Sequence, residues 1–152
     1  ASGMGVKQDF IKAVELLKKA SNGGDAYAGY SLGNMYSMGD GVKKDFKESA
    51  YWYEKSANAG NAQSSYNLGY LYTYGDGVKK NLTTAFHWYE KSANAGNIDA
   101  QINLSFIFIS GQGVKKDMNK AAFWAKKVLD TGDERIKQIW EQFELEKYLD
   151  KK

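Results

Sequence analysis

Apolar and small side chains recur every three to four residues over most of this chain, which is the period of an amphipathic helix. One example is the stretch 45–60, where one helical face carries Phe46, Ser49, Ala50, Tyr53 and Ala57. Asp45 begins this stretch as a typical N-cap, Glu48 stands where a capping box would place it, and Gly60 suits the left-handed position after a helix. The pattern therefore predicts a helix with a defined beginning and end.

The same signals predict eight helices and no strands. We expect them at about 9–22, 25–38, 45–59, 61–74, 81–95, 97–110, 117–131 and 133–150. The expected N-caps are Asp9, Asp25, Asp45, Asn61, Asn81, Asn97, Asp117 and Asp133. A glycine followed directly by Asp or Asn links successive helices at 24–25, 60–61, 96–97 and 132–133. Links this short place neighbouring helices antiparallel.

A strict period of 36 residues organises the chain. Gly-Val occurs at 5–6, 41–42, 77–78 and 113–114, and WYEKSANAGN at 52–61 returns unchanged at 88–97. A period of this size predicts an all-α solenoid, a stack of identical helix pairs. We expect one domain over 1–152, divided into a partial repeat 1–24, repeats 25–60, 61–96 and 97–132, and a C-terminal capping helix 133–150.

Two packing expectations follow from the repeat. Glycine inside a helix is unfavourable, so Gly33 and Gly69 predict close helix contacts, with Trp52 and Trp88 as the large neighbours. Residues 1–8 align with 37–44, so we expect the chain to begin inside a repeat and to be a processed or engineered fragment of a longer protein. The helix 9–22 would then lack a partner.

Without that partner, the apolar side of the helix 9–22 would be exposed or buried in a contact or dimer with another molecule. The residues on this side are Phe10, Val14 and Leu17.

The repeated words resemble a known family. The motif small-x-x-x-Leu-Gly-x-x-Tyr-x-x-Gly-x-Gly-Val, then Asp and Ala-x-x-Trp-Tyr-x-Lys-x-Ala-x-x-Gly, resembles the Sel1-like repeat, a relative of tetratricopeptide repeats. It is carried by Leu32, Gly33, Tyr36, Gly39, Gly41, Val42, Asp45, Trp52, Tyr53, Lys55, Ala57 and Gly60, and recurs at 62–96 and, with substitutions, in the third repeat. One departure is systematic, since Lys7, Lys43, Lys79 and Lys115 stand where the family often has proline.

The resemblance implies a right-handed superhelix that holds a protein or peptide on its concave face. It points to a bacterial adaptor, an inhibitor or immunity protein, or a regulatory protein. It favours the periplasm or secretion over the cytoplasm. An alternative also comes from the family, because cysteine-rich relatives suggest a cell-wall hydrolase or a β-lactam-binding protein.

Composition argues against that alternative. The chain has no Cys, a single histidine and a single arginine among 21 basic residues. Thiolate metal sites and thiol nucleophiles are thereby excluded, and little acid–base chemistry remains. His87 occupies a column that also holds Glu15, Tyr51 and Phe123, which is typical of a helix surface. We therefore expect a non-catalytic protein with no cofactor or metal site, no transmembrane segment and no nucleic-acid partner.

Differences between the repeats give the candidate site. Positions on the first helix of each pair vary where the fold does not need them to be constant. The predicted partner-binding residues are Tyr30, Asn34, Tyr66, Asn67, Tyr70, Tyr74, Asn103 and Phe106. They would form an aromatic groove edged by amides, suited to a peptide or helix. For the column with Tyr30 and Tyr66, simple packing between repeats remains open as the alternative.

Lysine pairs recur in the long turns and form a second candidate surface. This basic ladder consists of Lys43, Lys44, Lys79, Lys80, Lys115 and Lys116. It could attract an acidic protein or an anionic surface, or it could serve solubility alone. The sequence leaves both interpretations open.

Overall fold

The chain is all-helical over the part that the structure describes. The computed structural model describes the backbone of residues 2–149 and the side chains of residues 10–149. The helices are α1 (Ser2–Asn22), α2 (Ala26–Met38), α3 (Phe46–Asn58), α4 (Ala62–Tyr74), α5 (Leu82–Asn94), α6 (Ile98–Ser110), α7 (Met118–Leu129), the 3₁₀ helix η1 (Glu134–Ile136), α8 (Lys137–Gln142) and the 3₁₀ helix η2 (Leu145–Tyr148). None of these described helices combines the length and the apolar character needed to cross a membrane.

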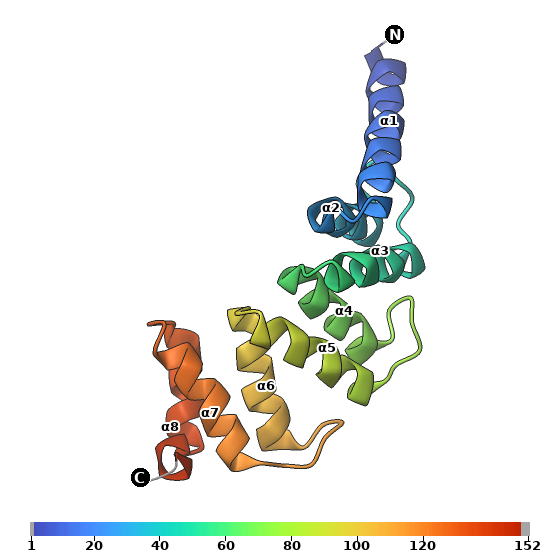
Figure 1. Ribbon diagram of the computed structural model, residues 1–152. Helices are drawn as coiled ribbons and strands as arrows, with labels where there is room; N and C mark the ends of the chain where they lie inside the picture. The colour runs from blue at the N-terminus through green and yellow to red at the C-terminus, as the bar shows by residue number, and fades with distance from the viewer. Residues whose placement is uncertain (1, 150–152) are drawn as a thin grey trace.

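The helices follow one another as a curved stack with the two termini at opposite ends (Figure 1). Each helix from α1 to α7 contacts the next one in the chain, and α2 also contacts α4 in the following repeat. The three long turns, 39–45, 75–81 and 111–117, lie in a row along the same outer edge (Figure 1). Contacts between neighbours in the stack define the solenoid.

Side-chain caps set the helix boundaries, as the sequence predicts. Asp45 Oδ1 accepts hydrogen bonds from the backbone N–H groups of Lys47 at 2.9 Å and Glu48 at 3.2 Å. The same role is filled by Asp25, Asn61, Asn81, Asn97, Asp117 and Asp133. The expected capping box is wrong in its second half, because the Glu48 carboxylate instead accepts from the indole N–H of Trp52 at 3.0 Å.

One leucine per repeat forms the centre of the core. Leu32, Leu68 and Leu104 are at most 1% exposed. Each belongs to a different cluster of buried side chains along the stack, and the cluster around Leu104 is the largest because it extends into the C-terminal segment. The core is therefore a series of linked clusters, one after another along the solenoid.

The helical glycines do allow close packing, but against a different aromatic residue from the one expected. A Cβ atom on Gly33 would lie 2.3 Å from Cδ1 of Tyr53, and one on Gly69 would lie 2.9 Å from Cδ1 of Tyr89. Trp52 was the expected neighbour, and this expectation is wrong. Successive residues on a helix point about 100° apart, so Tyr53 lies against Gly33 while Trp52 packs with Val14 and Leu32.

The first helix differs from its prediction. It begins at Ser2, so Asp9 lies inside α1 and is not its N-cap. In the later repeats the corresponding cap is anchored by a backbone bond to a residue nine positions earlier, such as Asp45 N–H to Tyr36 O at 2.9 Å. At Asp9 the helix is continuous instead.

Exposure along α1 also corrects the prediction. Phe10 is 38% exposed, as expected, but Val14 is only 9% exposed because it packs with Leu32 and Trp52. Leu17 is half-buried against the same cluster. Leu16, at 68%, is the most exposed large apolar side chain described on this helix.

The C-terminal segment is not the continuous helix predicted over 133–150. It is divided into η1, α8 and η2, and the division falls at Glu144, whose φ of 47° is left-handed. The reversal lets Ile136 and Leu145 both reach zero exposure. Arg135 ties the segment to α6 through a 2.6 Å ion pair from Nη1 to Oδ1 of Asp99. The segment still covers the end of the stack.

Candidate functional site

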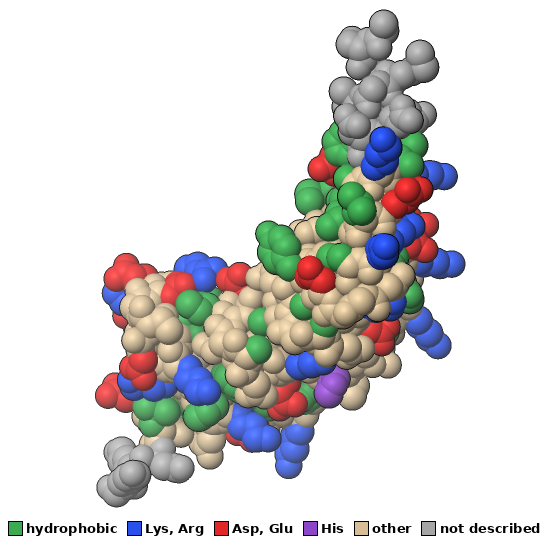
Figure 2. Space-filling view, turned by 45° about the horizontal axis from the view of Figure 1, so that its top comes forward, with side chains coloured by type: hydrophobic (Ala, Val, Ile, Leu, Met, Phe, Trp, Pro, Cys, Tyr) green, Lys and Arg blue, Asp and Glu red, His purple; other side chains and the backbone are tan. Residues whose placement is uncertain are grey.

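The exposed sides of α2, α4 and α6 form a surface, here called the groove face, that is almost free of charge. Together these helices contain one carboxylate, Asp99, and no basic residue. Asp99 is paired with Arg135. By contrast, α3, α5 and α7 all carry lysines. Figure 2 shows Lys and Arg side chains projecting mainly from the rim of the molecule.

Aromatic side chains take the place of charges on the groove face. Tyr70 is 45% exposed, Tyr74 61% and Phe106 47%. The Tyr70 and Tyr74 rings lie 4.4 Å apart between centroids in a tilted arrangement. Three of the predicted residues are therefore accessible to a partner.

The first of two hollows on this face is here called the upstream pocket, with a volume of about 420 Å³. It is lined by Ser37, Phe46, Tyr53, Tyr66, Asn67, Tyr70, Leu71 and Asp76. Its walls are aromatic and aliphatic, and an amide, a hydroxyl and a carboxylate stand among them. This mixture suits an apolar side chain whose neighbouring peptide groups need hydrogen-bond partners.

The second hollow, here called the downstream pocket, lies one repeat later and has a volume of about 270 Å³. It is lined by Thr73, Tyr74, Leu82, Ala85, Tyr89, Asn103, Phe106, Ile107 and Gln112. Seven of the eight residues that line the upstream pocket have their 36-residue equivalents here, all except Tyr66. The groove face thus presents two versions of one pocket in tandem.

A chain of amides fixes the orientation of Asn67. Gln63 Nε2 donates to Asn67 Oδ1 at 3.2 Å, and Asn97 Nδ2 donates to Gln63 Oε1 at 2.9 Å. With its oxygen so engaged, Asn67 presents its NH₂ group to the upstream pocket, beside the Tyr53 hydroxyl. This NH₂ group can donate to a ligand carbonyl, whereas Asn34 has its oxygen occupied by the Tyr53 hydroxyl at 2.6 Å.

The column that contains Tyr30 and Tyr66 packs against the neighbouring helix and also helps to line a pocket. Both rings are half-buried, with Tyr30 6.4 Å from Tyr53 and Tyr66 5.7 Å from Tyr89 between centroids. Burial raises the pKa of Tyr66, and the nearby carboxylate of Asp99 adds to the rise. Tyr66 also lines the upstream pocket.

Tyr89, which lines the downstream pocket, should make stability depend on alkaline pH. Burial raises the pKa of Tyr89 from 10.0 to about 12. The unfolded chain therefore ionises first, and the stabilisation, complete below pH 10, should decline as the pH rises toward 12. We expect Tyr89→Phe to flatten this part of the stability profile, measured by urea unfolding between these pH values. An unchanged slope would contradict the assignment to Tyr89.

The basic ladder lies away from the groove face. All six lysines are exposed, in the long turns on the outer edge of the stack. Lys44 lies with Nζ 4.7 Å from the ring centroid of Phe46. The structure brings the ladder and the groove residues to different surfaces of the molecule.

Several pocket residues were missed when single columns of the sequence were compared. Phe46 and Tyr53 come from α3, and Asp76 comes from a turn, so each pocket combines three helices and one turn. They could have been found by comparing whole sets of residues that are 36 positions apart in the sequence.

His87 is exposed, with its ring 5.7 Å from that of Trp88. Among the described residues, no cluster of His, Asp and Glu could hold a metal ion.

Comparisons with known proteins agree with this architecture. The family model described as Sel1 repeat matches residues 1–25, 26–61, 62–97 and 98–128. A comparison with curated proteins finds no match.

Solved structures include three similar bacterial proteins. A Sel1 repeat protein from Oxalobacter formigenes is 34% identical, with a TM-score of 0.76, over 83% of this chain and 95% of that one. A protective antigen of uropathogenic Escherichia coli with an SLR fold is 31% identical, with a TM-score of 0.73, over 78% of this chain. The chain spans about a quarter (26%) of the antigen.

Cysteine rich protein B of Helicobacter pylori is 23% identical, with a TM-score of 0.67, over 88% of this chain and 96% of that one. This third likeness concerns the fold alone. Together with the repeat spans, the three structures confirm the predicted right-handed α-solenoid of antiparallel helix pairs.

Proposed function

This chain belongs to the Sel1 repeat family, whose members generally mediate protein–protein interaction, and from this premise we propose that it binds a peptide segment of a partner protein on its groove face. The observation that carries the proposal is the tandem pair of pockets, repeated with the period of the fold. A ligand with two apolar side chains can occupy both.

The spacing of the pockets suggests what such a peptide looks like. Helices packed in contact lie about 8–10 Å apart, and α2 contacts α4 directly. An extended chain covers about 10 Å with three residues. The proposed ligand is an extended segment with two aromatic or aliphatic anchors about three residues apart, and Asn67 and Asn103 hydrogen-bond its backbone.

The near absence of charge on α2, α4 and α6 gives the proposal a second feature that can be measured. Ionic steering depends on salt, whereas burial of aromatic side chains hardly does. Binding on the groove face should therefore change little between low and high ionic strength. Charged residues in the ligand should be outside the two anchor positions.

A non-catalytic role fits the family, which typically provides interaction scaffolds. The alternative is a cell-wall hydrolase or a β-lactam-binding protein, and neither the comparisons nor the described residues support it. The likeness to the Helicobacter cysteine rich protein concerns the fold alone.

Replacing Tyr70 and Tyr74 together with alanine should weaken binding by about tenfold or more, because truncation of an exposed aromatic anchor typically costs more than 1 kcal/mol. The ligands for this test are peptides selected from a phage-displayed random library on the wild-type protein. Their dissociation constants are then measured by fluorescence anisotropy. Both rings are exposed, so the unfolding midpoint should stay the same.

The matched control is Tyr51→Ala, since Tyr51 is 48% exposed but lies on α3, outside both pockets. This variant should bind the selected peptides as the wild type does. Peptides that bind the double variant with undiminished affinity would place the site elsewhere. Failure to select any peptide would also count against the groove.

A further inference from the structure

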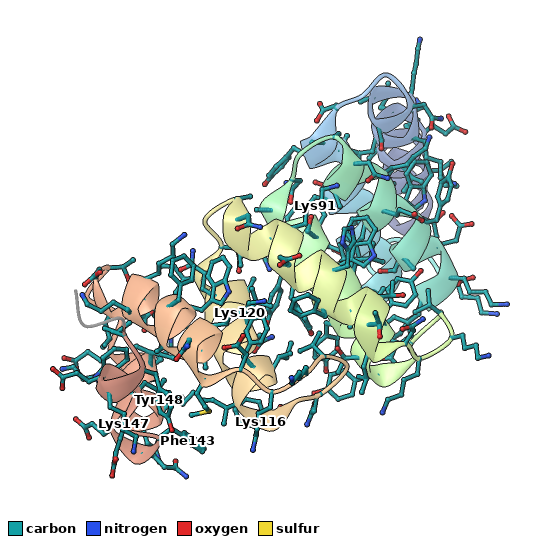
Figure 3. The ribbon with its side chains drawn as sticks, turned by 60° about the horizontal axis from the view of Figure 1, so that its bottom comes forward. Lys91, Lys116, Lys120, Phe143, Lys147 and Tyr148 are labelled. Carbon is teal, nitrogen blue, oxygen red and sulfur yellow. The ribbon has the colours of Figure 1, made fainter. Side chains whose placement is uncertain are left out.

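A third hollow lies on the outer edge of the stack and is here called the turn pocket. It is lined by Phe86, Phe108, Val114, Lys115, Lys116, Asp117 and Lys120, and its volume is about 420 Å³. Phe86 and Phe108 form an apolar floor, with their rings edge to face at 5.5 Å. Lys120 Nζ stands 5.4 Å from the Phe108 ring centroid. Figure 3 labels Lys116 and Lys120 beside the turn that joins α6 to α7.

Charge rises along the three long turns toward this pocket. The segment 39–48 has three lysines and three acids, so it carries no net charge. The equivalent segment 75–84 has two lysines and one acid, and the segment 111–120 has three lysines and one acid. Net side-chain charge therefore goes from 0 to +1 to +2. The most positive turn is the one that contains the aromatic hollow.

Three substitutions set the third turn and the helices beside it apart from their equivalents. Lys120 replaces Glu48 and Thr84, and Gln112 replaces Asp40 and Asp76. Phe86 corresponds to Val14, Ala50 and Ala122, so the repeat 61–96 alone has an aromatic ring at that position. No ion pair involving Lys115, Lys116 or Lys120 is formed within residues 10–149. No described carboxylate therefore neutralises their charge through an ion pair.

We propose that the turn pocket binds a short acidic segment of a partner protein, with one apolar side chain on the phenylalanine floor and carboxylates beside the lysines. The apolar floor supplies burial, and the three ammonium groups supply charge complementarity. Asp117 stands at the rim, where its carboxylate caps α7 by accepting from the Lys120 N–H at 3.0 Å.

Nucleic acid fits this pocket less well than an acidic peptide does. The single arginine, Arg135, is already bound to Asp99 and Asp133 and is not available for phosphate contacts. This site is separate from the groove face, so either proposal can fail without the other.

The test uses a fluorescein-labelled peptide with a central phenylalanine flanked by glutamates, titrated with the full chain by fluorescence anisotropy. We expect saturable binding that weakens strongly between about 50 mM and about 500 mM salt. Lys116→Glu should lower the affinity about tenfold, since it replaces an attraction with a repulsion. Phe86→Ala, which installs the residue found at Ala50, should lower it about fivefold.

The repeat provides a matched control in Lys44, which occupies the position of Lys116 in the balanced first turn. Lys44→Glu should change the affinity less than twofold. Equal losses for Lys44→Glu and Lys116→Glu would overturn the proposal, because they would indicate general charge attraction. Absence of saturable binding, equal binding of a lysine-flanked peptide, or full competition by single-stranded DNA would also overturn it.

Discussion

Replacing Leu68 with alanine is expected to lower the free energy of unfolding by about 2–5 kcal/mol. Leu68 is 1% exposed and packs in a cluster with Tyr53, Leu71 and Trp88. Its truncation removes apolar contacts and leaves a cavity in the middle cluster of the stack. Because units in a solenoid touch only their neighbours, this loss also weakens the coupling between the two halves of the molecule. Urea unfolding followed by far-UV circular dichroism measures the change.

Leu16→Ala is the matched control for this prediction. It makes the same chemical change at a side chain that is 68% exposed on α1. Surface substitutions of this kind usually change stability by about 0.5 kcal/mol or less. Similar losses for Leu16→Ala and Leu68→Ala would show that burial in the leucine column does not determine the effect.

The sequence predicts the fold well because the signals for each helix are local and occur several times. Asp45 and Asn61 cap helices with their own neighbouring N–H groups, so their role does not depend on distant parts of the chain. The 36-residue period then turns one recognised helix pair into the whole stack. Where this repetition ends, the prediction becomes weaker.

Both ends of the chain illustrate that limit. The turn expected before Asp9 does not form, and α1 extends through it. At the other end, Glu144 adopts a left-handed conformation that is usual for glycine or asparagine and unusual for glutamate. No local signal marks that reversal, since it follows from the burial of Leu145 against the core.

The candidate site could be predicted only in part. The exposed rings of Tyr70 and Phe106 follow from comparison of equivalent helix positions. The pockets do not, because side chains from the neighbouring helix and turn complete them. Helical periodicity also could not decide which of the adjacent Trp52 and Tyr53 faces Gly33, since both are buried.

Two surfaces with opposite physical chemistry emerge from one repeat. The groove face has aromatic rings and amides with little charge, and the turn pocket has ammonium groups over an aromatic floor. Salt therefore separates the two proposals experimentally. A ligand of the groove face should tolerate high ionic strength, and a ligand of the turn pocket should not.

Gly77→Ala should destabilise the protein by about 3 kcal/mol or more, the other large effect we expect. Gly77 has a φ of 70°, where a side chain is strained by about 1–2 kcal/mol. In addition, a Cβ there would lie 2.2 Å from the backbone carbon of Phe46 and 2.6 Å from the nitrogen of Lys47. These backbone atoms belong to the start of α3, so relief requires the turn to move away from that helix.

Two other glycines separate the strain of the left-handed backbone from the overlap with α3. Gly96 has a φ of 91° and open space around its Cβ position, so Gly96→Ala should show the strain alone. Gly41→Ala should be intermediate, because its Cβ would meet the Phe10 ring, which can rotate. Urea unfolding should rank the losses Gly77, Gly41, Gly96. Equal losses for Gly77→Ala and Gly96→Ala would mean that contact with α3 does not hold the turn in place. The same contact would then also not hold Asp76 at the edge of the upstream pocket.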